Sequence, residues 1–213
     1  MYGETDGSAA AEGAGCADRP LSMYAASKRS TELLASSYAS MFHLPSTGLR
    51  FFTVYGTHGR PDMAVWKFTD AVQGGRPIAL TATSAFKRDF THVSDIVEGI
   101  VCIMLHPPPL GTAAAGVDPR PHTVFNIGRA DPVTVDELIS IIEVAAGKKA
   151  IVQRQDALSV DVTSTHADVS KLMGLCGKSP ATPLKEGVTA FVRWYQEYSA
   201  GKSACAAGWP REN

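Results

Sequence analysis

Apolar residues recur along the chain at two spacings, and the change between them divides the sequence into alternating helices and strands. A long helix is predicted from Ser22, a residue type that often caps helices, to His43, after which Leu44 and Pro45 end it. The remaining predicted elements, in chain order, are a strand over 47–54, a helix over 62–74, strands over 77–80 and 88–93, a helix over 94–106, a strand over 124–127, a helix from Thr134, a strand over 150–153 and a final helix from Pro183. This alternation is typical of the α/β class.

Polar residues at the boundaries support several of these elements. Thr134 and Glu137 form a capping box, and Gly147 is placed to end the helix that they open. Ser94 is predicted to cap the third helix. The segment 107–121 is rich in proline and small residues, which predicts a flexible insertion in a surface loop.

Composition narrows the possible partners. The 213-residue chain is 45% apolar, enough for one fair-sized globular core or for the remainder of a larger one. Its net charge of −1 gives no basic surplus that would indicate nucleic acid, and its apolar runs are shorter than a membrane span. The 4 cysteines and 6 histidines lack the spacing of metal ligands or paired cysteines, so neither a metal nor a disulfide is predicted.

Tyr24 and Lys28 form a Tyr-x-x-x-Lys pair within the first predicted helix. Residues four apart on a helix share a face, so the phenol and the ammonium group can point at one ligand. A lysine cation favours the phenolate, and a phenolate can take the proton from a sugar hydroxyl while hydride leaves for a nicotinamide. Tyr198 and Lys202 have the same spacing in a small-residue tail, and we interpret that second match as chance.

A chain that uses such a pair with a dinucleotide should carry a strand, a Gly-x-x-Gly-x-x-Gly turn and a helix well upstream. The sequence contains no such module. Gly13 and Gly15 follow no apolar strand and precede no helix, so they are predicted to lie in a loop. We therefore expect that the chain carries only part of a nucleotide-binding domain.

Several segments resemble one known family and lie in its order along almost the whole chain: 22–28 (SMYAASK), 47–56 (TGLRFFTVYG), 59–64 (GRPDMA), 88–97 (RDFTHVSDIV), 124–128 (VFNIG), 182–187 (TPLKEG) and 191–195 (FVRWY). They resemble the NAD-dependent nucleotide-sugar epimerases and dehydratases of the extended short-chain dehydrogenase/reductase family. Within that family, UDP-glucuronate 4-epimerases look nearest.

The resemblance implies the C-terminal half of a doubly wound, Rossmann-like parallel sheet plus a smaller α/β substrate-binding domain, with the N-terminal βαβ half that binds NAD missing. Residues 1–56 would be the remainder of the NAD-binding domain with the Tyr-x-x-x-Lys helix. Residues 57–199 would be the UDP-sugar domain, interleaved with late Rossmann elements, and 200–213 a loose tail. NAD is the implied cofactor, and tight NAD binding by this chain alone is not expected without the glycine-rich turn.

The implied partners are a UDP-sugar substrate and, in the full-length form, a second copy of the chain that docks through the Tyr24 helix. No nucleic acid is implied. The cytoplasm is the favoured location, and a Golgi membrane would apply if a missing N-terminus carried an anchor.

The resemblance also assigns roles on the cofactor side. Tyr24 would be the acid/base at the 4-hydroxyl of the sugar, and Lys28 would bind the nicotinamide ribose. Phe51 and Phe52, at the end of a strand, would contact the nicotinamide. The catalytic serine or threonine of the family would fall just before Met1, so this chain lacks it.

On the substrate side, Thr53 stands where galactose-type relatives carry asparagine and glucuronate enzymes carry threonine. Arg60 and Arg88 would bind the pyrophosphate or the ribose of the nucleotide through their forked guanidinium groups. Asp161 would match an acidic residue near the nucleotide. A Ser-Val pair replaces the Pro-Gly that relatives place directly before it, so their stiff turn is lost there.

The implied reaction interconverts UDP-glucuronate and UDP-galacturonate through a 4-keto intermediate and transient NADH. Without the glycine-rich motif and the catalytic serine or threonine, the chain is expected to be inactive alone. Two alternatives stay open: a non-catalytic remnant that binds a sugar nucleotide or a partner, and a sister nucleotide-sugar dehydratase or decarboxylase.

Overall fold

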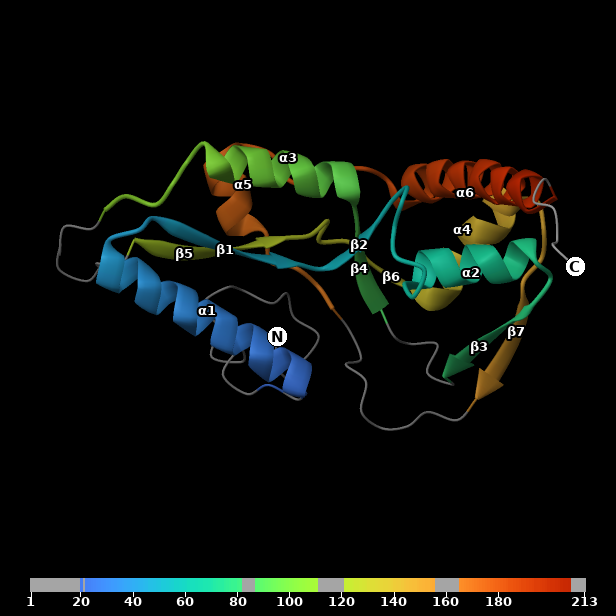
Figure 1. Cartoon of the computed structure of the whole chain (residues 1–213), viewed down its shortest axis with the longest axis horizontal. Helices are drawn as coiled ribbons and strands as arrows, with labels where there is room; N and C mark the ends of the chain where they lie inside the picture. Colours follow the sequence, from blue (N-terminus) through green and yellow to red (C-terminus); the bar gives the residue numbers. More distant parts are fainter. Residues whose placement is uncertain (1–19, 21, 82–86, 111–120, 156–164, 208–213) are drawn as a thin grey trace, which may run out of the picture. The chain divides into compact units, whose positions relative to one another are not determined.

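The structure is a computed structural model, and it describes residues 20, 22–81, 87–110, 121–155 and 165–207 (Figure 1). The chain divides into two compact units, each drawn from separate stretches of sequence. Unit 1 comprises Met1–Val54, Lys87–Pro132 and Val162–Ala181, and unit 2 comprises Tyr55–Phe86, Val133–Asp161 and Thr182–Asn213. The chain therefore leaves and re-enters each unit along its length.

A pair of parallel strands with helices on both sides forms the centre of unit 1. β1 (Ser46–Phe51) pairs with β5 (His122–Ile127) in a register that runs from Ser46 opposite His122 to Phe51 opposite Ile127. α1 (Met23–Phe42) lies on one side of this pair, and α3 (Val93–Met104) and α5 (Ser170–Cys176) lie on the other (Figure 1). Parallel strands covered on both faces are typical of α/β proteins.

α1 begins and ends where the sequence predicts. The Ser22 hydroxyl accepts a hydrogen bond from the Ala25 N–H at 3.1 Å, and His43, in the left-handed region at φ 54°, ends the helix. The buried side chains of α1 are Ala25, Glu32, Ser36 and Ala39. Three of these are small, so the helix backbone approaches the strands closely.

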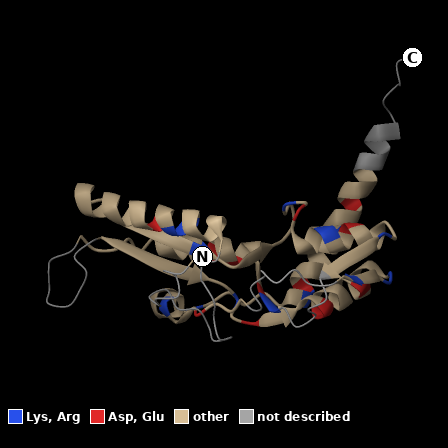
Figure 2. Cartoon of the chain, turned by 90° about the horizontal axis from the view of Figure 1, so that it is seen from below, with Lys and Arg blue, Asp and Glu red and all other residues tan. Residues whose placement is uncertain are grey.

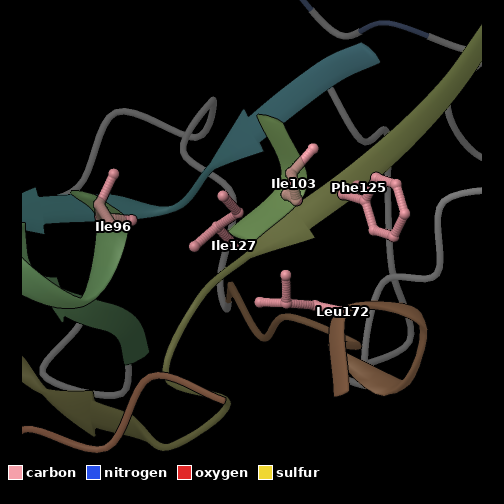
Figure 3. Packing of buried hydrophobic residues seen from close by; sticks show 5 residues of the cluster. All are labelled: Ile96, Ile103, Phe125, Ile127 and Leu172. Atoms are coloured by element: carbon pink, nitrogen blue, oxygen red, sulfur yellow. The ribbon is translucent and has the colours of Figure 1, made fainter. Parts of the chain in front are cut away.

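Apolar side chains from α3, α5 and β5 form the core of unit 1 (Figure 3). Ile96 and Ile103 of α3 and Leu172 of α5 pack in one cluster with Phe125 and Ile127 of β5, and each is 6% exposed or less. Burying a side chain of this kind contributes roughly 1.5–3 kcal/mol. Apolar packing therefore holds these two helices to the strand.

A disulfide also joins α3 to α5. The sulfur atoms of Cys102 and Cys176 are 2.01 Å apart. The prediction that the chain has no disulfide is wrong for this pair, because the tertiary packing of α3 on α5 brings together cysteines separated by 74 positions. The Lys178 ammonium group, just after α5, also bonds the Glu98 carboxylate of α3 at 2.5 Å.

A three-stranded sheet has the order β2-β4-β6, where β2 is Thr53–Tyr55, β4 is Lys87–His92 and β6 is Pro132–Thr134. β1 and β2 replace the single strand predicted over 47–54, because Phe52 belongs to neither strand. β6 and α5 are short elements that no sequence pattern predicts.

α3 begins earlier than the sequence predicts. The Nδ1 atom of His92 accepts a hydrogen bond from the Ser94 N–H at 3.3 Å, so His92 is the cap. The prediction that Ser94 caps this helix is wrong, because Ser94 already lies in the first turn.

Unit 2 has a parallel pair of its own, in which β3 (Pro77–Thr81) runs beside β7 (Ile151–Gln155). Its helices are α2 (Ala64–Gln73), α4 (Val135–Ala146) and α6 (Leu184–Ala207). The capping box predicted for α4 is confirmed, and Gly147 ends that helix at φ 66°. α6 continues beyond residue 200, into the segment predicted as a loose tail.

Aromatic rings pack α2 against α6 in unit 2. The indole of Trp66 lies with its ring centroid 5.4–5.9 Å from four rings of α6: Phe191, Trp194, Tyr195 and Tyr198. The Tyr195 hydroxyl donates to the Asp70 carboxylate at 2.5 Å. Burial and this hydrogen bond raise the pKa of Tyr195 to about 12.

Reduction of the Cys102–Cys176 disulfide is expected to lower the stability of unit 1. A crosslink between residues 74 positions apart removes chain entropy from the unfolded state, which stabilises a protein by about 2–4 kcal/mol. The melting temperature measured by circular dichroism should therefore fall by roughly 5–15 °C in dithiothreitol. Cys102→Ser is the control, since it should melt at the lower temperature with or without reductant. Equal melting temperatures for oxidised and reduced wild type would contradict the expectation.

Candidate functional site

The first turns of α1 hold the Tyr-x-x-x-Lys pair together. The Lys28 ammonium nitrogen lies 5.5 Å from the centroid of the Tyr24 ring. Tyr24 is 70% exposed and Lys28 is also exposed, so both groups can reach a ligand. The structure therefore brings phenol and ammonium side by side, as their spacing predicts.

The end of β1 carries the predicted nicotinamide and sugar contacts. Phe51 is the last residue of β1 and is 47% exposed, whereas Phe52 is half-buried. Thr53 opens β2 and is half-buried. Since β2 and β4 are neighbours in their sheet, Thr53 and Arg88 lie on adjacent strands.

Arg88 is half-buried on β4, and its guanidinium group donates to the Lys87 carbonyl at 3.0 Å. Arg60 lies in unit 2, in the segment after β2, and is exposed. It pairs with Asp62, where its Nε donates to a carboxylate oxygen at 3.0 Å. The hydrogen bond from Arg60 lowers the pKa of Asp62. Asp161 lies outside the described residues.

Asp89, beside Arg88, is a fully buried carboxyl group that ties three segments of unit 1 together. Its side-chain oxygens accept hydrogen bonds from the backbone N–H groups of Arg129 at 3.0 Å, Ala130 at 2.9 Å and Ala167 at 3.1 Å. Burial raises the pKa of Asp89, while these three N–H groups act in the opposite direction. Because three backbone donors point at it, the side chain is an acceptor that holds the turn after β5 and the segment before α5 to β4.

Gly128 makes the close approach around Asp89 possible. A Cβ atom at this position would lie 2.5 Å from the Cβ of Ala167 and 3.0 Å from a carboxylate oxygen of Asp89. The first distance is too short for any Cβ atom, and the second is a tight contact. Position 128 therefore requires glycine for the space that it leaves.

Other charged groups pair across the surface. Lysines and arginines lie close to acidic residues on several elements (Figure 2), as in the pairs Arg154–Asp136 and Lys149–Glu143. Among the described residues, no three His, Cys, Asp or Glu side chains gather in a way that could hold a metal ion. None of the described helices is both long and apolar enough to cross a membrane.

Parallel strands with helices on both faces, and a Tyr-x-x-x-Lys pair on the helix next to β1, define a doubly wound, Rossmann-like α/β protein. The sequence profile of the NAD dependent epimerase/dehydratase family matches residues 1–128. The chain belongs to this NAD-dependent family.

Relatives of known name are similar over most of the chain. Protein CapI of Staphylococcus aureus is 43% identical over 187 residues, which cover 85% of this chain and 56% of CapI. A probable UDP-glucuronate 4-epimerase of Rhizobium meliloti is 40% identical over 188 residues, 85% of this chain and 55% of the relative. The chain thus spans about half the length of these relatives.

Two solved structures are also similar to most of this chain. MoeE5 in complex with UDP-glucuronic acid and NAD has a TM-score of 0.78 and 33% identity, over 92% of this chain and 62% of MoeE5. UDP-glucuronic acid 4-epimerase from Bacillus cereus, in complex with UDP-glucuronic acid and NAD, has a TM-score of 0.77 and 30% identity, over 92% of this chain and 59% of that protein.

Three charged residues at this site were not predicted from the sequence: Glu32, Arg50 and Asp89. All are buried, with exposed fractions of 9%, 4% and 0%. A signal was present for Arg50, because it lies inside a short strand between Leu49 and Phe51. A charge in such a place needs a buried partner.

Gly128→Ala is expected to destabilise unit 1 by about 1–3 kcal/mol, because the methyl group has no room beside Ala167. Denaturant unfolding should show a lower midpoint with an unchanged slope. Gly174→Ala in α5 is the matched control: its Cβ would meet nothing within 4 Å, so it should be neutral or stabilising. Equal midpoints for Gly128→Ala and wild type would refute the steric argument.

Proposed function

We propose that this chain is the C-terminal part of a UDP-glucuronate 4-epimerase, and that it is inactive alone. The observation that carries the proposal is the exposed Tyr24–Lys28 pair, with the ammonium nitrogen 5.5 Å from the ring centroid. The likeness to named UDP-glucuronate 4-epimerases supports this substrate over other sugar nucleotides.

Tyr24 takes the proton from the 4-hydroxyl of the sugar and returns it after inversion. Lys28, whose ammonium nitrogen lies 5.5 Å from the ring centroid of Tyr24, binds the ribose next to the nicotinamide. NAD, when bound, supplies the hydride acceptor and donor at C4. The exposed ring of Phe51 offers an apolar surface for the nicotinamide at the carboxyl end of β1, where ligands bind in open α/β sheets.

The remaining predicted residues serve the substrate. Thr53 offers a hydroxyl to the sugar, and Arg88 and Arg60 offer guanidinium groups to the pyrophosphate or the nucleotide's ribose. The pair of Arg60 with Asp62 is exposed and therefore weakened by water, so a pyrophosphate can compete for the guanidinium group. Asp161 would contact the nucleotide.

The residues present fit only the nicotinamide end of NAD. The sequence contains no Gly-x-x-Gly-x-x-Gly turn, the element that holds the pyrophosphate at a helix N-terminus. Inactivity of the 213-residue chain follows, since proximity of NAD to C4 supplies much of the rate. The second candidate is a non-catalytic remnant that binds a sugar nucleotide or a partner.

The outer face of α1 supports a homodimer in the full-length form. Leu34, Tyr38 and Met41 lie along this face and are 63%, 60% and 70% exposed. Contiguous exposed apolar side chains on a helix are typical of a protein interface. We infer that a second copy of the longer protein docks there.

Tyr24→Phe is expected to remove turnover while leaving UDP-glucuronate binding unchanged, because only the transferable proton is lost. The transcript's 5′ end should first be sequenced, and the longer product should then be assayed with UDP-glucuronate and NAD by chromatography of the sugar nucleotides. We expect a loss of at least about 100-fold in kcat. Tyr198→Phe, at the second Tyr-x-x-x-Lys match, is the control and should keep wild-type turnover.

Several outcomes would contradict this proposal. A Tyr24→Phe enzyme with normal kcat would refute the role of the phenol. If no upstream glycine-rich module is found and the chain binds no NAD, the remnant is the correct alternative. An upstream acidic pair with loss of water from the sugar would instead indicate a dehydratase.

Leu34→Glu is expected to convert the longer protein from dimer to monomer, because a carboxylate placed in an apolar interface is desolvated without a partner. Light scattering after size-exclusion chromatography measures the mass. Val97→Glu, on the exposed face of α3, is the control and should remain dimeric; Val97 is 53% exposed. A dimer that survives Leu34→Glu would place the interface elsewhere.

A further inference from the structure

We propose that the buried ion pair between Glu32 and Arg50 positions Tyr24 and Lys28 for catalysis. The inference rests on the proposed function, because it takes Tyr24 as the acid/base. Arg50 donates two hydrogen bonds to Glu32, from Nε to Oε1 at 2.7 Å and from Nη2 to Oε2 at 2.8 Å. A forked pair of this kind fixes both the distance and the orientation of its partners.

Glu32 belongs to the same row of helix positions as the catalytic pair. Residues four apart advance by about 40° beyond a full turn, so the row winds slowly around α1. Tyr24 and Lys28 are exposed, and Glu32, next in the row, is 9% exposed. Glu32 is therefore the point at which the catalytic row of α1 reaches the strands.

Arg50 lies at the carboxyl end of β1, one residue before Phe51, so the Glu32–Arg50 ion pair also lies at that end of the strand. The short connection over 43–45 makes α1 and β1 run in opposite directions (Figure 1). The turn that carries Tyr24 therefore extends past Arg50, about 12 Å along the helix axis from Glu32, toward the side where ligands bind. A shift of Glu32 on Arg50 would move Tyr24 with it.

Apolar packing alone does not specify this position. The other buried side chains of α1 are Ala25, Ser36 and Ala39, which form a smooth surface without a large side chain to lock the helix lengthwise. Glu32 is the one long side chain among the buried residues of the described α1. Directional contacts of this kind are the best-attested use of buried charges.

The charges of the pair persist inside the protein. Burial raises the pKa of Glu32, but hydrogen bonds and positive charge from Arg50, and then from Arg29, outweigh it and lower the pKa of this carboxyl from its ordinary value. Arg29 contributes a further hydrogen bond at 3.0 Å. The Glu32 side chain is thus a carboxylate bound by the guanidinium groups of Arg50 and Arg29.

A double variant, Glu32→Leu with Arg50→Met, separates positioning from stability. Replacing a buried ion pair by apolar residues of similar size often leaves stability unchanged, whereas it removes the directional contact. In the longer protein we expect kcat to fall at least tenfold with KM within about threefold, since displacement of about 1 Å can cost 100-fold. In the 213-residue chain, amides of 26–31 should exchange hydrogen at least tenfold faster, with a melting temperature within a few degrees of wild type.

The matched control is Glu143→Leu with Lys149→Met, which removes an ion pair of unit 2 and should leave kcat and α1 exchange unchanged. Wild-type kcat and wild-type exchange in the double variant would overturn the proposal. So would faster exchange spread equally over α3 and β5, which would indicate a general loss of stability. If the wild-type longer protein has no epimerase activity, the proposed function fails, and the exchange measurement alone decides whether the pair holds the Tyr24 turn.

Discussion

Unit 1 depends most on the hydrogen bonds that the buried carboxyl group of Asp89 accepts. That unit is drawn from separate stretches of chain, so something must hold β4, the turn after β5 and the segment before α5 in one place. Asp89 does this with three backbone hydrogen bonds, and Gly128 leaves the space for them. The disulfide from α3 to α5 reinforces the same assembly covalently.

Each proposed ligand contact of unit 1 that lies on β1 or β4 sits directly beside a buried charge. Arg50 precedes Phe51 on β1, and Asp89 follows Arg88 on β4. Because neighbouring residues of a strand point to opposite faces, one side chain can anchor the strand while the next is presented to a ligand. The buried charge thus fixes the position of the neighbouring residue that contacts the ligand. Its burial carries the desolvation cost of any buried charge.

Local sequence signals predict the helix ends correctly where a single segment decides the outcome. Ser22, the Thr134–Glu137 capping box and Gly147 mark helix ends, because caps satisfy nearby backbone groups. Ser94 does not cap α3, because the helix already begins at Val93 and the His92 side chain accepts the hydrogen bond from the Ser94 N–H. Short elements such as β6 and α5 gave no signal, since a few residues carry too little periodicity.

By itself the sequence determined the α/β class, the family and the Tyr24–Lys28 pair, because spacing along one helix places two side chains together whatever the rest of the chain does. Only the tertiary structure decided the Cys102–Cys176 bond, the Glu32–Arg50 pair and the Asp89 network. These contacts join residues far apart in sequence, and their partners become neighbours only when helices and strands pack. The local pattern of apolar and polar residues does not specify these contacts, because it shows the periodicity of one segment and not which distant side chains come into contact.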